Sequence, residues 1–251
     1  MAEEGVWRSD LPDTFRIEDQ VHVWRIPLVG DAALLGRLTA VLDAAEKQRV
    51  NRFVFAADRR RYLLSHAALR LILSNYLPQE PDMLIFGLGA YGKPYLQSSG
   101  PGYGLQFNLT HTPEMALIAV TGSLAVGIDI EQVRPLDDAL AIADRFFSAE
   151  EIADLRTVAG TTFEAQAFFN CWTRKEAIIK AQGAGLSRAL DSFAVTLLPD
   201  EAVVVRRDDQ RPASQEPWHL RALHPGPNYA AALAVENAPQ SIQYWTWSWT
   251  A

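Results

Sequence analysis

The spacing of apolar residues along the chain changes between a period of two, typical of strands, and a period near 3.6, typical of helices. β-Branched and aromatic residues over 21–28 predict a first strand that ends at a Pro-Leu-Val-Gly turn. Asp31 is a candidate N-cap, and the apolar stripe that follows it predicts one helix over 32–50. A second helix is expected over 58–76, before Pro78.

The middle of the chain predicts strands first and helices afterwards. Residues 87–104 are rich in glycine and indicate a loop with a short strand at 93–96. Three strands follow at 105–112, 114–122 and 124–131, and then two helices at about 137–146 and 149–158. Ser148 and Glu151 have the spacing of a capping box at the second of these helices. A longer helix over 162–182 ends at two glycines, and the remainder is expected to form strands.

The two halves of the chain follow the same order of elements, which suggests a duplication. Each half runs from a strand through helices to a cluster of strands, and EMALIAV (114–120) and YAAALAV (229–235) occupy similar places. We interpret this pattern as two similar α+β subdomains, 1–123 and 124–251. Chance likeness between apolar strands is the alternative, because topology is hard to derive from one sequence.

Composition narrows the class of protein. The chain has 251 residues, of which 49% are hydrophobic, as in soluble globular proteins. Its net charge of −7 argues against a general nucleic-acid binder, and a single cysteine, Cys171, excludes an intramolecular disulfide. The start lacks the features of a signal peptide, and no run approaches the ~20 apolar residues of a membrane span. We therefore expect a cytoplasmic protein without a membrane partner.

Two carboxylates in the segment GIDIE (127–131) are the first candidates for chemistry. Strand alternation places Ile128 and Ile130 towards the core, and Asp129 and Glu131 together on the other face. The small residues beside them are expected to leave open space. A divalent cation with oxygen ligands suits two like charges at this spacing. A solvent-facing strand with acidic side chains is the alternative.

The segment WTRKEAIIK (172–180) is the second candidate, and it falls within the long helix. Glu176 and Lys180 are four residues apart and share a helix face, with Lys175 beside them. This face could offer a carboxylate to a metal and a lysine to a phosphate. An ordinary Glu-to-Lys helix pair is the alternative.

Two further groups of residues could bind anions. A basic cluster lies within 47–61 and could hold a phosphate-rich small molecule or simply cover solvated helix ends; it consists of Lys47, Arg49, Arg52, Arg59, Arg60 and Arg61. Lys93 lies in a glycine-bracketed loop without the spacing of a P-loop. His111 lies at the end of the strand FNLTHT. It is either a buried core histidine or a hydrogen-bond donor to a phosphate.

Taken in order, these motifs resemble the 4′-phosphopantetheinyl transferases, in particular the larger monomeric class that activates surfactin synthetase. The matching elements are the basic helical region, GKP, FNLTHT, VGIDIE, FFSAEE and WTRKEAIIKAQGAGL, which together cover about residues 46–195. The pair formed by GIDIE and WxxKEAxxK is the most specific part. The resemblance implies an α+β fold of two similar subdomains related by a pseudo-twofold axis, with mainly antiparallel sheets packed against helices and the active site between them.

The resemblance also implies the activity and its residues. Phosphopantetheine of coenzyme A would be transferred to a serine of an apo acyl or peptidyl carrier protein, with release of adenosine 3′,5′-bisphosphate. Asp129, Glu131 and Glu176 match the ligands of Mg²⁺, for which Mn²⁺ could substitute. Glu176, Lys180 and Asp129 are the expected catalytic residues, with Glu176 as the candidate base and Lys180 acting on the leaving bisphosphate. The expected coenzyme A ligands are Arg49, Arg61, Lys93, Thr110, His111, Lys175 and Lys180.

The chain departs from the family pattern at a few positions. Glu46 stands where a basic residue is expected, and Thr110 replaces the usual serine but keeps the hydroxyl. Glu151 matches an acidic family position and also fits the capping box. Two other functions stay open on the sequence alone: a Mg²⁺-dependent phosphoryl transferase or hydrolase acting on nucleotides, and a family member that only binds carrier proteins or coenzyme A.

Overall fold

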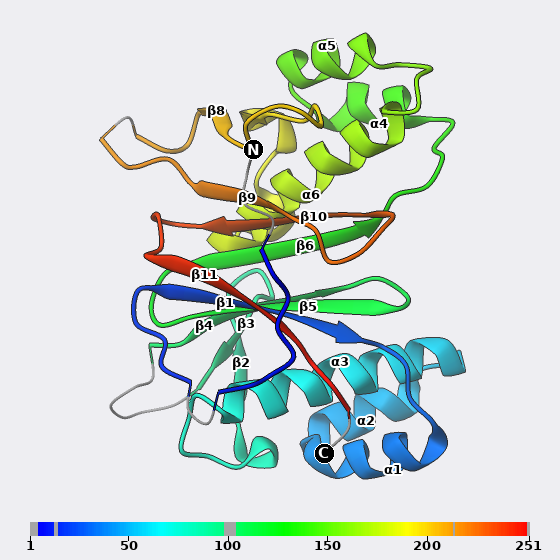
Figure 1. Ribbon diagram of the computed structural model, residues 1–251, viewed down its shortest axis with the longest axis vertical. Helices are drawn as coiled ribbons and strands as arrows, with labels where there is room; N and C mark the ends of the chain where they lie inside the picture. Colours follow the sequence, from blue (N-terminus) through cyan, green and yellow to red (C-terminus); the bar gives the residue numbers. More distant parts are fainter. Residues whose placement is uncertain (1–4, 13–14, 98–103, 213, 250–251) are drawn as a thin grey trace.

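Two β-sheets packed face to face form the centre of the molecule, and helices cover the outer face of each sheet (Figure 1). The computed structural model describes residues 5–12, 15–97, 104–212 and 214–249. The part of the expected glycine-rich loop at 98–103 lies outside these residues. Within the described ranges, no helix is both long and apolar enough to cross a membrane.

The first half of the chain builds the lower two layers of Figure 1. A strand is followed by three helices, a short hairpin with a 3₁₀ turn before it, and two longer strands. These elements are β1 (Gln20–Pro27), α1 (Ala32–Val41), α2 (Ala44–Arg52), α3 (Ala56–Ser74), the turn Pro81–Met83, β2 (Phe86–Leu88), β3 (Pro94–Leu96), β4 (Gln106–His111) and β5 (Met115–Thr121).

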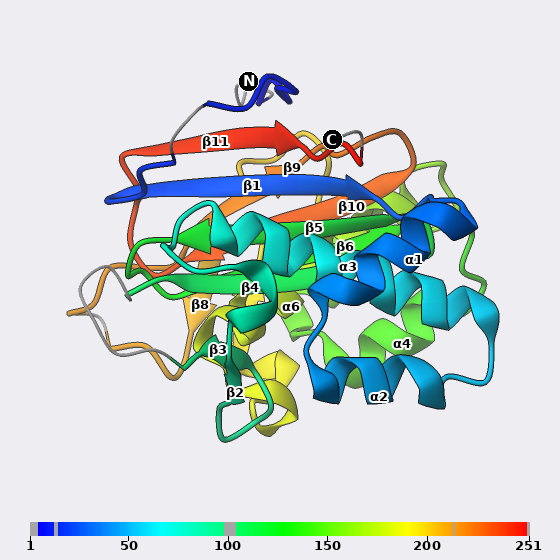
Figure 2. The same ribbon diagram turned by 90° about the horizontal axis from the view of Figure 1, so that it is seen from below.

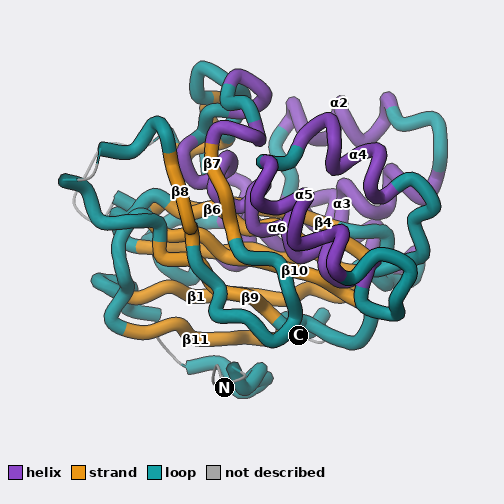
Figure 3. The backbone as a smooth tube through the Cα atoms, turned by 90° about the horizontal axis from the view of Figure 1, so that it is seen from above, coloured by secondary structure: helices purple, strands orange, loops and turns teal. Residues whose placement is uncertain are grey.

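The second half, apart from its last strand, builds the upper two layers, and Figure 3 shows its helices lying over its strands. It consists of β6 (Val126–Gln132), α4 (Ala139–Phe146), α5 (Ala149–Thr157), α6 (Glu164–Gln182), the 3₁₀ turns Gly185–Ser187 and Leu190–Ser192, β7 (Phe193–Val195), β8 (Val205–Asp208), β9 (His219–Leu223), β10 (Tyr229–Val235) and β11 (Ser241–Thr246).

The order of strands in the two sheets confirms the expected repeat. The described strands run β11-β1-β5-β4 in one sheet and β6-β10-β9 in the other. β1, β5 and β4 therefore correspond to β6, β10 and β9, and the pairing is antiparallel at each equivalent position. The segments EMALIAV and YAAALAV are the equivalent strands β5 and β10. The last strand, β11, leaves its own half and joins the first sheet, parallel to β1.

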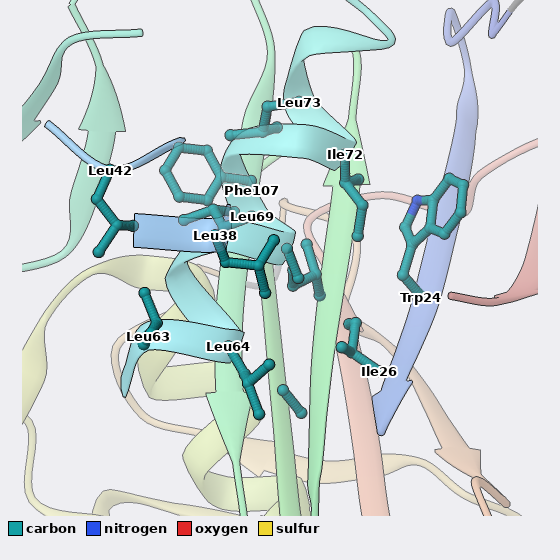
Figure 4. Packing of buried hydrophobic residues seen from close by; sticks show 14 of the residues in the cluster. Trp24, Ile26, Leu38, Leu42, Leu63, Leu64, Leu69, Ile72, Leu73 and Phe107 are labelled. Carbon is teal, nitrogen blue, oxygen red and sulfur yellow. The ribbon is translucent and has the colours of Figure 1, made fainter. Parts of the chain in front are cut away.

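Three apolar cores hold these four layers together. Alternate residues of β1 serve two of them: Val21 and Val23 face the opposite sheet, whereas Trp24 and Ile26 face the helices. Figure 4 shows Trp24 and Ile26 among leucines of α1 and α3. A separate core lies between α4–α6 and the outer face of the second sheet. Burial of each large apolar side chain contributes about 1.5–3 kcal/mol, so each pair of layers has its own stabilisation.

The helix expected over 32–50 is wrong in one respect, because the structure has two helices there. Asp31 caps α1 as predicted and accepts from the amide of Leu34. The helix then ends before Asp43, whose side chain caps α2 and forms a capping box with Glu46. An acid three residues before a glutamate is an N-terminal signal that the continuous apolar stripe concealed.

Candidate functional site

Helix α6 packs closely on strand β6 because residue 127 has no side chain. A Cβ atom at Gly127 would overlap the backbone carbonyl of Ala177 and the amide of Ala181. The open space expected on this face is therefore filled by the helix, which corrects the sequence-based picture. The close approach brings the α6 residues Glu176 and Lys180 to the face of β6 that carries the two carboxylates of the GIDIE motif.

Three elements meet at the side chain of Asp129. The Lys180 ammonium donates to Asp129 Oδ1 at 2.6 Å and lies 3.3 Å from Thr110 Oγ1. The Thr110 hydroxyl itself donates to Asp129 Oδ1 at 3.1 Å, which links β4 to β6 and α6. The Asp129 side chain is 5% exposed and that of Lys180 29%, so the lysine reaches solvent whereas the carboxylate does not.

The other oxygen of Asp129, Oδ2, is buried and has no hydrogen-bond partner among the described residues. Burial, followed by the charge of Asp129, raises the pKa of both Glu131 and Glu176, and Lys180 partly offsets the effect. The three carboxylates thus lie within electrostatic reach of one another. No three described His, Cys, Asp or Glu side chains, however, are gathered into a group that could hold a metal ion.

Two side chains lock the GKP and FNLTHT motifs to the second half of the chain. Asn108 accepts a hydrogen bond from the amide of Ile128 at 2.9 Å, so the amide side chain joins β4 to β6. Lys93 donates to the carbonyls of Val126 at 2.9 Å and Ala181 at 3.0 Å. Burial lowers the pKa of Lys93 to about 8. Lys93 lies in the loop that joins β2 to β3, directly before β3. Figure 2 shows this hairpin projecting beside α6.

A cavity of about 450 Å³ opens between these elements. Apolar side chains alternate around it with polar and charged ones, of which Asn108 comes from β4 and Glu176 and Lys180 from α6. Its lining consists of Tyr91, Gly92, Lys93, Pro94, Asn108, Phe146, Glu176, Ile179, Lys180, Gly183, Gly185, Arg188, Ala189 and Leu190. Sequence reasoning missed Asn108 and Arg188 as site residues. For Asn108 the signal was present, because it stands inside the FNLTHT motif.

Basic residues of the first half lie near His111, which follows Thr110 in β4. Burial lowers the pKa of His111, and the charge of Arg61 lowers it further, with smaller effects of His66 and Lys180. Arg61, His66 and Lys180 are therefore close enough to His111 to disfavour its protonated form. Arg61 pairs with Asp58 at 3.0 Å, and the guanidinium of Arg49 lies 5.2 Å from the ring centre of Tyr62.

Lys175 lies away from this site, in contrast to the sequence-based expectation. Its side chain is wholly buried, and its ammonium binds Glu151 at 2.8 Å and the carbonyls of Leu190 and Phe193. Glu151 also accepts from the amides of Ser148 and Val195, each at 2.8 Å, which confirms the predicted capping box. Because the ammonium is enclosed, we leave Lys175 out of the proposed binding residues.

Comparison with known proteins covers both halves of the chain. The family model of the 4′-phosphopantetheinyl transferase superfamily matches residues 125–234, and that of the 4′-phosphopantetheinyl transferase N-terminal region matches residues 32–123. The 4′-phosphopantetheinyl transferase HetI of a Nostoc strain is 36% identical over 96% of this chain and 98% of its own.

Two relatives from Bacillus support the same assignment. The transferase psf-1 of Bacillus pumilus is 38% identical over 79% of this chain and 81% of its own. Sfp of Bacillus subtilis is 30% identical over 79% of this chain and 84% of its own. The chain therefore belongs to the 4′-phosphopantetheinyl transferase superfamily and is an enzyme that transfers phosphopantetheine from coenzyme A to carrier proteins.

Proposed function

We propose that the acceptor is a serine hydroxyl of an apo acyl or peptidyl carrier protein and that adenosine 3′,5′-bisphosphate is released. The meeting of Thr110 and Asp129 with Lys180, which lines the cavity, is the observation that carries this proposal. It joins a hydroxyl, a carboxylate with one unpartnered oxygen and a partly exposed ammonium next to a largely apolar cavity. That combination suits a substrate with charged phosphates at one end and an uncharged arm at the other.

We propose that Asp129, Glu131 and Glu176 hold Mg²⁺, or Mn²⁺ in its place. Carboxylate oxygens are the ligands these cations prefer, and the buried Oδ2 of Asp129 lacks any partner among the described residues. Burial, followed by the charge of Asp129, raises the pKa of Glu131 and Glu176, so a bound cation would stabilise the ionised form of both carboxylates. When bound, the metal neutralises the pyrophosphate of coenzyme A and polarises its phosphorus.

The chain's own residues then have separate roles in the transfer. The serine oxygen bonds to the phosphorus that carries the pantetheine arm, and the bond from that phosphorus to adenosine 3′,5′-bisphosphate breaks. Glu176 accepts the serine proton, directly or through a water molecule. Lys180 donates to the phosphate that leaves, because its ammonium is exposed enough to reach it.

Coenzyme A is proposed to lie across both halves of the molecule. The 3′-phosphate binds on the side of Arg49, Arg61 and His111, where positively charged side chains lie near the exposed imidazole at the end of β4. Thr110 stands between this side and Asp129, and the pantetheine arm enters the cavity. Lys93 adds a positive charge to the wall of the cavity while it holds the end of α6.

The arrangement also supports a proposal for organisation. We propose subdomains of residues 1–123 and 124–251, with β11 contributed to the first sheet, because each half has its own core under its helices. Both sides of the cavity come from one chain, so the enzyme is proposed to act as a monomer. Its partners are proposed to be carrier proteins and coenzyme A in the cytoplasm, without nucleic acid or membrane.

Mass spectrometry of apo carrier proteins tests the proposal. Fatty-acid, polyketide and peptide carriers are each incubated with the enzyme, coenzyme A and Mg²⁺. We expect one phosphopantetheine on the serine of at least one carrier, and none after chelation by EDTA. The proposed acceptor would be wrong if no carrier gained mass. Release of the bisphosphate without any carrier would instead favour a hydrolase.

A further inference from the structure

Glu46 occupies the place where the resemblance leads one to expect a basic residue, and the structure shows what it does there. Its side chain is 10% exposed and is held by three residues. It completes the capping box of α2 with Asp43, accepts from Arg70 Nε at 2.5 Å, and lies 3.0 Å from His66 Nδ1. Glu46 therefore points into the protein and links α2 to α3.

The Arg70 guanidinium fixes this carboxylate firmly. It is wholly buried, also pairs with Asp43, and donates to the carbonyls of Pro81 at 2.8 Å and Leu84 at 2.9 Å. Burial alone would raise the pKa of Glu46, but the hydrogen bonds and charges of His66 and Arg70 outweigh it and lower that pKa. Glu46 thus stays ionised and offers His66 a fixed acceptor.

Two contacts set the orientation of the His66 ring. Glu46 holds Nδ1, and the ring stacks on Tyr62 with centroids 3.8 Å apart and planes 23° apart. The second ring nitrogen, Nε2, has no partner within the described residues, and the side chain is 25% exposed. When both ring nitrogens carry a proton, Nδ1 donates to Glu46 and Nε2 can donate to an anion in a defined direction.

The surroundings of His66 are positively charged. His66 is close enough to His111 to disfavour a proton there, as are Arg61 and Lys180. Arg49 lies over the same Tyr62 ring on which His66 stacks. Basic groups from α2, α3 and β4 thus surround one region, and Glu46, the acid nearest to His66, is already bound to Arg70.

We propose that His66 is a further ligand of the phosphate that Arg61 and His111 bind, and that Glu46 is its positioning residue. Helix α3 thus supplies, through His66, the donor that position 46 of α2 lacks. This inference rests on the proposed coenzyme A site and names a ligand that the motifs did not indicate.

Calorimetric binding of two nucleotides tests the role without requiring turnover. Adenosine 3′,5′-bisphosphate carries the phosphate in question, whereas adenosine 5′-monophosphate lacks it. We expect His66→Ala to weaken binding of the bisphosphate about tenfold or more and to leave that of the monophosphate unchanged. His66→Phe keeps a ring for stacking on Tyr62 but has no donor, so the same selective loss is expected.

Two other variants refine the test. His66→Gln places an amide donor near the position of Nε2 and should recover part of the affinity. Glu46→Gln should cause a smaller loss that is also confined to the bisphosphate. Equal losses for both nucleotides, or normal binding by His66→Phe, would show that His66 only supports the fold and would overturn the proposal. If the wild type bound neither nucleotide, the coenzyme A site itself would be wrong, and this role with it.

Discussion

The Lys180 ammonium lies 2.6 Å from Oδ1 of Asp129 and so joins α6 to β6 at the wall of the cavity. A cation from the chain therefore already occupies one oxygen of this carboxylate, while the other oxygen has no partner in the described part of the chain. The pair is both a structural link and the electrostatic centre of the proposed site.

Asp129→Asn should reduce kcat/KM for carrier modification by about two orders of magnitude or more, because it removes the charge that balances Lys180 and the proposed metal. Asp144→Asn is the matched control, since Asp144 pairs with Arg156 at the exposed surface and should be silent. Kinetics at limiting Mg²⁺, with thermal unfolding of each variant, provide the measurement. Near-normal turnover of Asp129→Asn would remove this residue from the metal ligands.

Gly127→Ala should lower both stability and activity. The new Cβ atom would push α6 away from β6, at a cost of about 1–3 kcal/mol or more, and would displace Glu176 and Lys180. Gly36→Ala in α1 is the control, because a Cβ there meets nothing and should raise stability by up to about 1 kcal/mol. Urea unfolding and kcat measurements should separate the two variants, and equal behaviour would contradict the close packing.

Lys93 should make the free energy of unfolding depend on pH above about 8. Its folded pKa is about 8, below the ordinary 10.5, so the unfolded chain binds more protons than the folded one between these two values. The contribution of Lys93 to stability should therefore rise with pH across this window, and the buried ammonium should cost stability below it. Urea unfolding of the wild type and Lys93→Met on both sides of pH about 8 measures the difference.

Loss of the Lys93 proton should weaken the binding of coenzyme A, although it makes the fold more stable. As Lys93 loses its proton above pH about 8, the KM for coenzyme A should rise in the wild type. Lys93→Arg keeps its charge and should show no such rise. Parallel profiles for the two proteins would assign the pH dependence to another group.

Lys175→Met should destabilise the protein by about 3–5 kcal/mol, because it leaves the wholly buried carboxylate of Glu151 without its ionic partner. Arg156→Met, at the exposed pair with Asp144, should cost less than about 1 kcal/mol. Affinity for coenzyme A should be unchanged in both variants, as measured by calorimetry. A stable Lys175→Met variant with weak binding would return Lys175 to the binding site.

Local patterns predicted much of the fold because they depend on near neighbours. Strand alternation correctly placed Asp129 and Glu131 opposite Ile128 and Ile130, and residue spacing revealed the capping box at Ser148. The apolar strands β5 and β10 marked the repeat because both are buried on both faces between layers.

Features that depend on the packing of distant elements were not accessible in the same way. Lys175 and Lys180 lie five residues apart, which is about 140° around a helix, so one enters the core when the other faces β6. The sequence does not say which of the two faces inward. The network around Arg70 similarly requires α2, α3 and the turn at Pro81–Met83 to be placed first.

The return of β11 to the first sheet ties the two halves of the molecule together. Its Trp245 ring stacks on Trp24 of β1 with centroids 5.8 Å apart, so the first core is completed by residues from the far end of the chain. A cut at residue 123 would leave β1 as an uncovered edge strand in one fragment and β11 without its partner strand in the other. The halves should therefore fold as a single cooperative unit, and separately expressed fragments should become soluble only when they are produced together.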